Sequence, residues 1–346
     1  MWMSSGELNK KFVFDVKGRI TTEGLLNSST RIIPPFCVLI GLAGQGKTRG
    51  TAAYNYISLC TNQSIAAILP NDKYNSLYLY YVVDSKYEYL RLLSSGDGGR
   101  GGLNKNLLNS LEISFPKTIA EQQAIAEALS DIDGLIVALD KKIAKKRLIK
   151  QGAMQQLLTG KKRLPGFSGP WMERKLGAIS QIKTGSCNGD QAVDNGKYPF
   201  FVRSQKVYAI DSYSYDGEAI LVPGEGGIGS IFHYINGKFD YHQRVYKISD
   251  FADNVCGKYI FFYMSRYFGE YALSLTVKAT VDSLRLPTFE EFVICMPLNI
   301  EEQQAIATIL NDMDKEIDDL EAQRDKYRLL KSGMMQKLLT GQIRLK

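Results

Sequence analysis

Residues 41–48 read Gly-Leu-Ala-Gly-Gln-Gly-Lys-Thr, which fits the phosphate-binding pattern GxxxxGK[ST] in full. In such a loop the glycine amides surround the phosphates, the lysine contacts them and the threonine binds Mg²⁺, so Lys47 and Thr48 could bind a nucleotide triphosphate. A phosphate loop must also open a helix, because the helix N-terminus faces the anion. Residues 49–58 instead contain the alternation Tyr54-Asn55-Tyr56-Ile57, which predicts a strand. We therefore keep nucleotide binding only as an alternative.

A second glycine-rich loop, Gly224–Gly229, matches the dinucleotide-binding pattern GxGxxG. It occupies the same place in an internal repeat as the first loop but lacks the Lys and Thr, so one structural role should explain both loops. We predict that the glycines form turns in which the backbone approaches a partner closely. Methylation of a base amino group usually requires Asn or Asp before Pro-Pro-aromatic. Here Ile33 precedes Pro34-Pro35-Phe36, so the polar acceptor is missing.

Polar side chains able to hydrogen-bond base edges cluster near these turns. Arg and Lys suit guanine, Asn and Gln suit adenine, and the amides of glycine loops suit phosphate. Any single member could be an ordinary solvated loop residue, so the hypothesis rests on the set. In the first half we predict DNA contacts from Gln45, Lys47, Thr48, Arg49, Asn62, Gln63, Arg100 and Asn104. In the second half we predict them from Arg203, Ser204, His242, Gln243, Arg244, Lys278, Thr280 and Arg285.

The elements that must position these residues include a long helix that the sequence contains twice. One copy runs from about Glu121 to Thr159 and the other from about Glu302 to Thr340, with a constant offset of 181 residues and about half of the paired positions identical. Thr118 and Asn299 stand three residues before the two glutamates, which is the spacing of a capping box. Gly160 and Gly341 follow the last apolar pairs, where a helix C-cap belongs.

Apolar residues recur along both helices at alternating steps of four and three, which predicts a coiled-coil seam. Because the two copies share this register, we expect the helices to pack against each other; two unrelated core helices are the other interpretation. The predicted seam consists of Ile125, Leu129, Ile132, Ile136, Leu139, Ile143, Ile306, Leu310, Met313, Ile317 and Leu320.

The remaining sequence forms two β-rich stretches that also follow the 181-residue offset approximately. Short apolar runs such as residues 37–40, 77–81, 219–222 and 259–263 support this reading. Asn62-Gln63 and His242-Gln243 correspond at an offset of 180, and Trp2-Met3-Ser4-Ser5 resembles the later residues 200–204. We predict an α+β fold with four parts. They are a first domain at 1–116, a first helix at 117–164, a second domain at 165–297 and a second helix at 298–346.

Composition excludes several classes of protein. The chain has 346 residues, ordinary globular composition and a formal net charge of +7, which is compatible with a nucleic-acid partner. Five scattered cysteines without a CxxC pair and only two histidines argue for a reducing compartment and against a metal site. No apolar run approaches the length of a membrane span, and no signal peptide is visible. We expect a cytoplasmic protein.

Several motifs together resemble the DNA specificity subunit of type I restriction-modification systems. The resemblance covers nearly the whole chain and is carried by its duplicated layout and by five segments. These segments are E302QQAIATIL310, M334MQKLLTGQIRL345 with its earlier copy M154QQLLTGKKRL164, D216GEAILVPGEGGIG229, H242QRVYKI248 and A279TVDSLRLP287.

The resemblance implies two target-recognition domains separated by two long antiparallel helices that form a coiled coil, related by a pseudo-twofold internal repeat. Each domain would read half of a split, asymmetric target in double-stranded DNA, and the helices would carry two methyltransferase subunits. It implies no catalysis and no cofactor in this chain. S-adenosylmethionine, and ATP with Mg for cleavage, would act in the methyltransferase and motor-nuclease subunits.

The chain departs from the family pattern at its N-terminus, where about 30 residues corresponding to Trp171–Pro199 have no counterpart. We therefore expect a shortened first recognition domain. Besides the nucleotide-binding alternative through Lys47 and Thr48, a coiled-coil scaffold that touches no DNA is a further alternative. Salt-dependent DNA binding would separate the scaffold from the specificity subunit.

Overall fold

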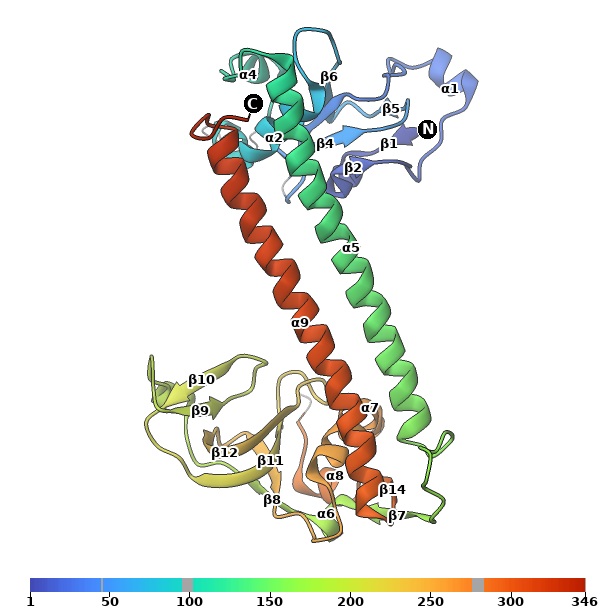
Figure 1. Cartoon of the computed structure of the whole chain (residues 1–346), viewed down its shortest axis with the longest axis vertical. Helices are drawn as coiled ribbons and strands as arrows, with labels where there is room; N and C mark the ends of the chain where they lie inside the picture. The colour runs from blue at the N-terminus through green and yellow to red at the C-terminus, as the bar shows by residue number, and fades with distance from the viewer. Residues whose placement is uncertain (45, 95–101, 276–282, 346) are drawn as a thin grey trace. The chain divides into compact units, whose positions relative to one another are not determined.

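The computed structural model describes residues 1–44, 46–94, 102–275 and 283–345. The chain forms two compact units, which are shown in Figure 1. The first unit comprises residues 1–141 and 322–346, and the second comprises residues 142–321. Each unit contains one β-rich domain, called here the first domain and the second domain, together with one part of each long helix.

The first domain is a small sheet covered by short helices. Its four-stranded sheet has the order β2-β4-β3-β6, and a separate parallel pair joins β1 to β5. The strands are β1 (Trp2–Met3), β2 (Phe12–Val13), β3 (Val38–Gly41), β4 (Ala52–Asn55), β5 (Cys60–Thr61) and β6 (Ile65–Ile68). The helices are η1 (Ser5–Lys10), α1 (Thr22–Leu26), α2 (Ser76–Ser85), α3 (Tyr87–Leu93) and α4 (Lys105–Asn109).

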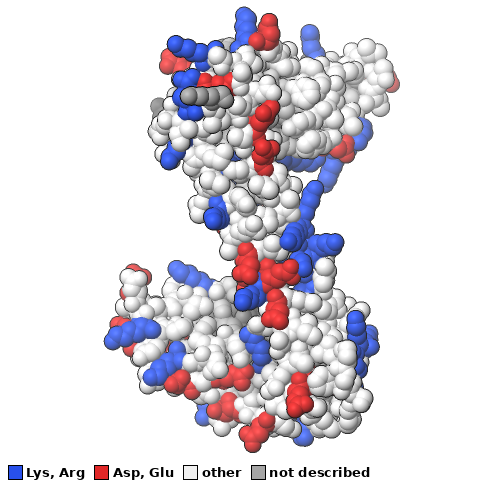
Figure 2. Space-filling model, viewed as in Figure 1, with Lys and Arg blue, Asp and Glu red and all other residues white. Residues whose placement is uncertain are grey.

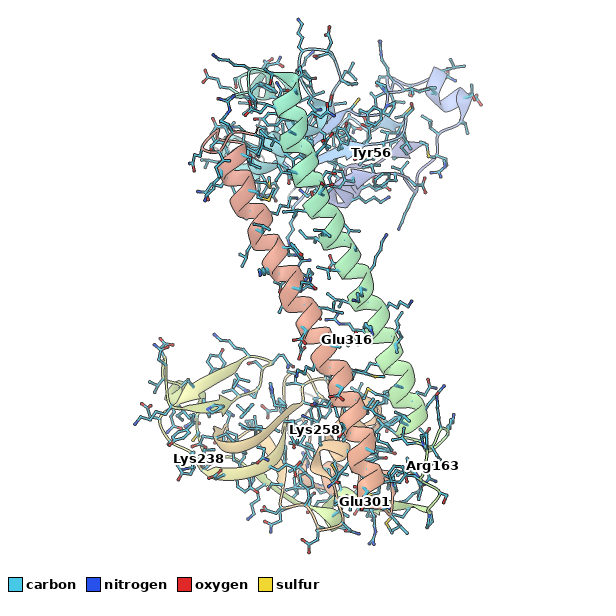
Figure 3. The ribbon with its side chains drawn as sticks, in the orientation of Figure 1. Tyr56, Arg163, Lys238, Lys258, Glu301 and Glu316 are labelled. Carbon is cyan, nitrogen blue, oxygen red and sulfur yellow. The ribbon has the colours of Figure 1, made fainter. Side chains whose placement is uncertain are left out.

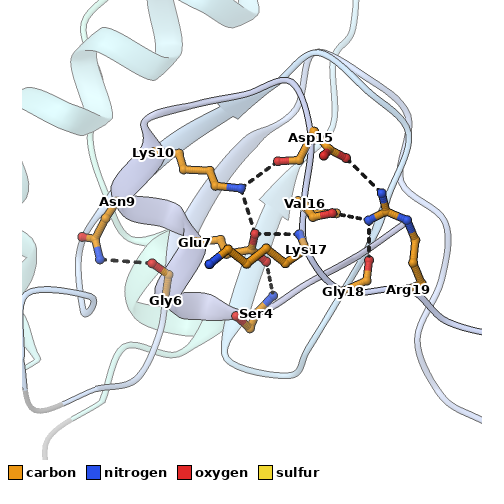
Figure 4. A network of polar contacts seen from close by, with 10 residues as sticks. All are labelled: Ser4, Gly6, Glu7, Asn9, Lys10, Asp15, Val16, Lys17, Gly18 and Arg19. Carbon is orange, nitrogen blue, oxygen red and sulfur yellow. Dashed lines mark hydrogen bonds and ion pairs between the residues drawn. The ribbon is translucent and has the colours of Figure 1, made fainter. Parts of the chain in front are cut away.

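Strand β3 is buried on both faces because its side chains alternate between two cores. Val38 and Ile40 pack with helix α2, and Leu39 packs with Met3, Leu8 and other residues on the opposite side. The segment that follows η1 is fixed by polar contacts (Figure 4). Glu7 Oε1 accepts from Lys10 Nζ at 2.9 Å and from Lys17 N at 3.1 Å, which ties residues 15–19 to the 3₁₀ helix.

The second domain is built on a six-stranded sheet of order β10-β9-β12-β11-β13-β8, with β14 paired to β7 beside it. The strands are β7 (Trp171–Lys175), β8 (Gln181–Thr184), β9 (Tyr198–Phe201), β10 (Val207–Ile210), β11 (Tyr215–Pro223), β12 (His233–Tyr241), β13 (Val245–Ser249) and β14 (Val293–Pro297). The helices are α6 (Leu176–Ile179), η2 (Gly189–Gln191), α7 (Gly257–Leu275) and α8 (Leu286–Glu290).

Strand register confirms the internal repeat inside the domains. Val38 pairs with Tyr54 and packs in the core that contains α2, and Ile220 pairs with Tyr234 and packs in the core that contains α7. Strand β1 pairs in parallel with β5 as β9 pairs with β12, which agrees with the predicted likeness of residues 2–5 to 200–204. The predicted α+β fold is therefore correct, with two β-rich domains and a duplicated layout.

Two apolar runs that we read as β-type are helical. Residues 77–81 lie in α2 and residues 259–263 lie in α7. A continuous apolar run has no readable period when an element is covered on nearly all sides, and Tyr78–Val83 are all buried. The cap was the overlooked signal in α2, because Asn75 Oδ1 accepts from Tyr78 N at 2.9 Å.

The long helices start and end close to the predicted positions. Helix α5 spans Ile119–Leu157 and α9 spans Ile300–Leu338, two residues earlier than expected at each end. Thr118 Oγ1 caps α5 by accepting from Glu121 N at 3.2 Å, whereas Asn299 Oδ1 accepts from Glu301 N at 2.7 Å. Gly160 and Gly341 adopt φ of 68° and 72°, the left-handed conformation of a C-cap.

Helices α5 and α9 pack antiparallel, as ion pairs within each unit show. In the first unit Asp133 pairs with Lys331 at 2.7 Å, and Asp140 pairs with Arg328 at 3.4 Å. In the second unit Lys146 pairs with Glu316, labelled in Figure 3, at 2.7 Å. In the described part of the chain, none of the helices combines the length and apolar content needed to cross a membrane.

The predicted seam is largely buried, but its members have two kinds of neighbour. Nine of the eleven residues are buried, while Leu139 and Met313 are partly buried. Ile125 and Leu129 belong to the core of the first domain, and Ile306 and Leu310 belong to the core of the second. The N-terminal part of each helix is thus also a core element of the domain that precedes it.

Two glutamines at the starts of the helices fix this arrangement in the same way. Gln122 Oε1 accepts from Asn75 N at 2.8 Å, and its Nε2 donates to Pro116 O at 3.1 Å. Gln303 Oε1 accepts from Cys256 N at 2.9 Å, and its Nε2 donates to Asn254 O at 3.1 Å and Pro297 O at 2.8 Å. Each amide therefore joins the start of α2 or α7 to the start of a long helix.

The neighbouring glutamates bind arginines that follow the other long helix. Arg163 donates Nε and Nη2 to Glu302 at 2.6 and 2.7 Å, and Arg344 binds Glu121 in the same bidentate way at 2.5 Å. Hydrogen bonding from Arg344 lowers the pKa of the Glu121 carboxyl. At each helix start, the glutamate thus binds the arginine that follows the other long helix. The glutamine next to it binds main-chain groups of the preceding domain.

Candidate nucleic-acid interface

Three segments of the second domain that carry predicted DNA contacts, or lie next to them, meet in space. Gly224 N donates to Arg244 O at 2.8 Å, and Leu284 N donates to Gly224 O at 2.8 Å. These bonds place the glycine loop after β11 beside the β12–β13 turn and beside the start of α8. Arg244 and Arg285 are exposed at this junction, where they are accessible to a ligand.

Side chains in this region are held by acidic and amide partners. Glu225 accepts from Arg244 Nη1 at 2.6 Å and from Arg203 Nη1 at 3.4 Å. Gln243 Nε2 donates to Asn188 Oδ1 at 2.7 Å. The exposed guanidinium groups and the Gln243 amide are thereby positioned at the surface before any ligand arrives.

His242 and Ser204 support the turns from inside. His242 is buried, and its Nδ1 accepts from Arg244 N at 2.9 Å. Burial lowers the pKa of the His242 imidazole, and Arg203 and Arg244 lower it further, so the ring is held neutral. Ser204 O accepts from His233 Nε2 at 3.1 Å. The His242 ring and the Ser204 main chain therefore support the shape of the turns.

The first domain brings the corresponding turns together. Leu42 N donates to Ser64 O at 2.8 Å, and Leu103 N donates to Leu42 O at 2.9 Å. The loop after β3, the turn between β5 and β6 and the start of α4 are therefore neighbours. Gln63 is exposed on the turn, and Asn62 Oδ1 accepts from Ser64 N at 3.3 Å.

A cavity of about 450 Å³ lies beside Asn62 and Gln63 and is also lined by Thr30, Arg31 and Ser28. Its polar lining resembles in kind the groups that read base edges. Asn104 lies at the nearby junction, but its Oδ1 accepts from Leu107 N at 3.0 Å and caps α4. Its amide nitrogen remains available to donate to a ligand.

The loop with the phosphate-binding pattern lies between two antiparallel strands, β3 and β4. Its carbonyl groups are bound by α3, since Arg91 donates to Gly46 O at 2.7 Å and Tyr87 donates to Lys47 O at 3.1 Å. Lys47 is exposed, and Thr48 and Arg49 are partly buried. The element that follows the loop is strand β4, whereas a phosphate loop requires a helix whose N-terminus faces the anion.

The dinucleotide-like loop has a packing role. A Cβ on Gly229, which has φ of 63°, would lie 2.4 Å from Gly269 Cα in α7. The predicted close approach therefore exists, and its partner is a helix of the same domain.

Hydrogen bonds support the predicted alignment of the two β-turns. Asn62 Oδ1 accepts from Ser64 N, as His242 Nδ1 accepts from Arg244 N. Asn62 O accepts from Ile65 N, as His242 O accepts from Val245 N. Asn62-Gln63 therefore corresponds to His242-Gln243 at the offset of 180, and Ser64 corresponds to Arg244.

Four predicted contacts, Gln45, Arg100, Lys278 and Thr280, lie outside the described residues. Sequence reasoning missed two residues that organise the second site. Glu225 stands inside the glycine loop, and its charge beside two arginines was a usable signal. Asn188 is 55 residues from Gln243, and nothing in the sequence links them.

Charge on the surface is mixed. Figure 2 shows Lys and Arg interspersed with Asp and Glu on the visible face of each domain. On this visible face charge does not single out a binding surface, and the converging turns are the more specific feature.

Comparison with known proteins gives consistent findings. A family model described as the type I restriction modification DNA specificity domain matches residues 2–147 and 169–327. The specificity subunit of the type I restriction enzyme MjaVIII from Methanocaldococcus jannaschii is 25% identical over 305 residues. The match covers 79% of this chain and 71% of that protein.

Two solved structures share the fold. The S subunit of a type I restriction-modification system from M. genitalium superposes with a TM-score of 0.73 at 16% identity, covering 97% of this chain and 87% of that chain. A chain from a structure concerning assembly of the type I system reaches a TM-score of 0.57 at 14% identity, covering 98% and 90% respectively.

Proposed function

We propose that each domain reads one half of a split, asymmetric DNA target. The proposal follows from the fact that this chain belongs to the type I restriction-modification DNA specificity family. The chain is a specificity subunit and a non-catalytic component of its complex. The cofactors of the system reside in the methyltransferase and restriction subunits. The proposal concerns how this chain selects its target and where its partners bind.

One observation supports the proposal that the two domains recognise different half-targets. Both domains bring the same three turns together through corresponding main-chain bonds, yet the exposed side chains differ. Ser64 stands where the second domain has Arg244, and Asn104 stands where it has Arg285. Asn suits adenine and Ser suits several bases, whereas Arg suits guanine. Equal scaffolds with different polar side chains favour two different half-targets.

Gln63→Ala and Arg244→Ala should each weaken binding at one half-target only. We expect a loss of about 1 to 3 kcal/mol for DNA carrying the cognate half-site, since each variant removes one base-edge contact. Fluorescence anisotropy of the assembled complex with DNA altered in one half measures this, and each variant is the control for the other. Equal loss on every sequence would assign these residues to phosphate contacts instead.

Matched pairs of exposed apolar residues support methyltransferase docking on the helices. Leu148 and Ile149 are 68% and 47% exposed, and their repeat partners Leu329 and Leu330 are 75% and 49% exposed. Each pair lies between Arg and Lys in both copies. Apolar side chains left exposed at the same position of a repeat favour two equivalent protein contacts, one for each methyltransferase subunit.

Leu148→Glu and Leu329→Glu should each weaken binding of one methyltransferase subunit by about tenfold or more, because a charge replaces an apolar contact. Native mass spectrometry should show complexes with one methyltransferase in place of two. Leu26→Glu is the matched control, as Leu26 is 78% exposed on the short helix α1. If the double variant Leu148→Glu/Leu329→Glu still bound two methyltransferases, this docking site would be contradicted.

Co-expression with the cognate methyltransferase subunit, followed by sequencing of methylated sites in host DNA, tests the whole proposal. A split motif with two defined halves and a fixed gap is expected. A single half-motif, or its palindrome, would mean that the first domain does not read DNA. Absence of methylation despite a stable complex would favour the scaffold alternative.

A further inference from the structure

Glu225 lies between two exposed arginines of the second domain. Its Oε1 accepts from Arg244 Nη1 at 2.6 Å, and its Oε2 accepts from Arg203 Nη1 at 3.4 Å. The Glu225 side chain is 23% exposed, against 52% for Arg203 and 58% for Arg244. Each carboxylate oxygen therefore holds one guanidinium, and all three side chains remain accessible to a ligand.

The main chain on both sides of this group is held in place. Gly224 N donates to Arg244 O, and Leu284 N donates to Gly224 O, both at 2.8 Å. Glu225 itself forms an isolated antiparallel bridge with Ser283. The carboxylate and the Arg244 guanidinium are thus positioned before a ligand arrives, which lowers the entropy lost on binding.

The chemistry of this group matches the edge of one base pair. A guanidinium has several N–H donors and a carboxylate has several lone pairs, so their mutual contacts leave donors and acceptors for a ligand. In the major groove a G·C pair presents the N7 and O6 acceptors of guanine next to the N4 amine of cytosine, which donates. Arginine suits the guanine and glutamate suits the cytosine. An adjoining arginine and glutamate can therefore contact both bases of a single pair.

A carboxylate in this position is costly if it only holds the arginines. Surfaces that bind DNA gain affinity by neutralising phosphates, and a negative side chain beside two arginines reduces that gain. A hydrogen bond from a base to the carboxylate would offset the loss and would add specificity. Direct contact with a base therefore explains Glu225 better than a supporting role alone.

The first domain has an alanine at the corresponding place. Leu42 makes there the two main-chain bonds that Gly224 makes in the second domain. The residue after Leu42 is Ala43, whereas the residue after Gly224 is Glu225. A contact made by this carboxylate should therefore affect the half-target of the second domain only.

We propose that Glu225 is a specificity-determining residue that accepts a hydrogen bond from the N4 amine of a cytosine, while Arg244 donates to the guanine paired with it. Arg203 binds the second carboxylate oxygen and positions the group. This inference rests on the proposed function, and it assigns a G·C pair to the half-target that the second domain reads.

DNA carrying N4-methylcytosine tests this contact once the half-targets are defined from the methylated sites. The methyl group replaces the N4 hydrogen that faces the major groove and keeps base pairing, whereas a methyl group on C5 leaves the amine intact and is the control. We expect N4-methylation of one cytosine in the second half-target to weaken binding of the assembled complex about tenfold. The complex with Glu225→Ala should lose less than about twofold at that cytosine. Asp253→Ala, which removes an exposed carboxylate of the same domain, should keep the full sensitivity.

A supporting role for Glu225 predicts a different result. Glu225→Ala would then weaken binding to every DNA by the same factor and stay as sensitive to N4-methylation as the native complex, which would overturn the inference. A defined second half-target without a G·C pair, or a native complex insensitive to N4-methylation at each of its cytosines, would also overturn it and leave the proposed function intact. Absence of a second half-target would overturn the proposed function together with this inference.

Discussion

Replacing Gln303 with alanine is expected to destabilise the second domain by about 3 kcal/mol. The side chain is fully buried and makes three hydrogen bonds to main-chain groups of Cys256, Asn254 and Pro297. Alanine leaves these groups without a partner, and each unsatisfied buried group costs about 1 to 3 kcal/mol, reduced where water enters. Urea unfolding followed by hydrogen exchange of peptides from the second domain measures the loss.

Gln304→Ala is the matched control because Gln304 is the next residue, is exposed and lies in the same helix. We expect a change within about 0.5 kcal/mol. Gln122→Ala should destabilise the first domain by less than Gln303→Ala, since Gln122 makes two such bonds. Equal stability of Gln303→Ala and Gln304→Ala would show that the amide does not join α7 to α9.

Arg163→Ala should also destabilise the second domain by about 3 kcal/mol. Glu302 is 1% exposed, so removal of its bidentate partner leaves a buried carboxylate uncompensated. Figure 3 shows Arg163 beside the start of α9, where Glu301 is also labelled. Thermal unfolding measured by calorimetry should show the expected decrease in the stability of the variant.

The double variant Arg163→Ala/Glu302→Gln distinguishes the cause. A neutral amide should recover part of the loss, because the unpaired charge is removed. Arg344→Ala should have a smaller effect on the first domain, since the Arg344 side chain is 58% exposed against 27% for Arg163. A single variant as stable as the double variant would contradict a role for charge.

Sequence predicted the long helices well because their evidence is local and repeated. Caps at Thr118 and Gly160, an apolar stripe and a second copy in the same register all point to one structure. The equivalence of the two glycine-rich loops was also predicted, since they occupy the same place in the repeat, but their convergence with two further turns was not. The hydrogen bonds of the two β-turns support the predicted correspondence of Asn62-Gln63 with His242-Gln243.

The remainder depended on contacts between distant residues. Gln122 and Gln303 follow the glutamates of the predicted capping boxes and were given no role from the sequence, because their partners include residues 47 positions away. The runs in α2 and α7 carry no period because they are surrounded by other apolar groups. Asn188 had no sequence signal either, because its partner Gln243 is 55 residues away.

The division of the chain between the two units also bears on the order in which they form. The second unit is the continuous stretch 142–321, whereas the first needs residues 322–346 in addition to 1–141. During synthesis the ribosome releases every residue of the second unit before Arg344 can reach Glu121. The half of the protein that is translated first is therefore the half that is completed last, and until then its core near Leu338 stays open to water and to other chains.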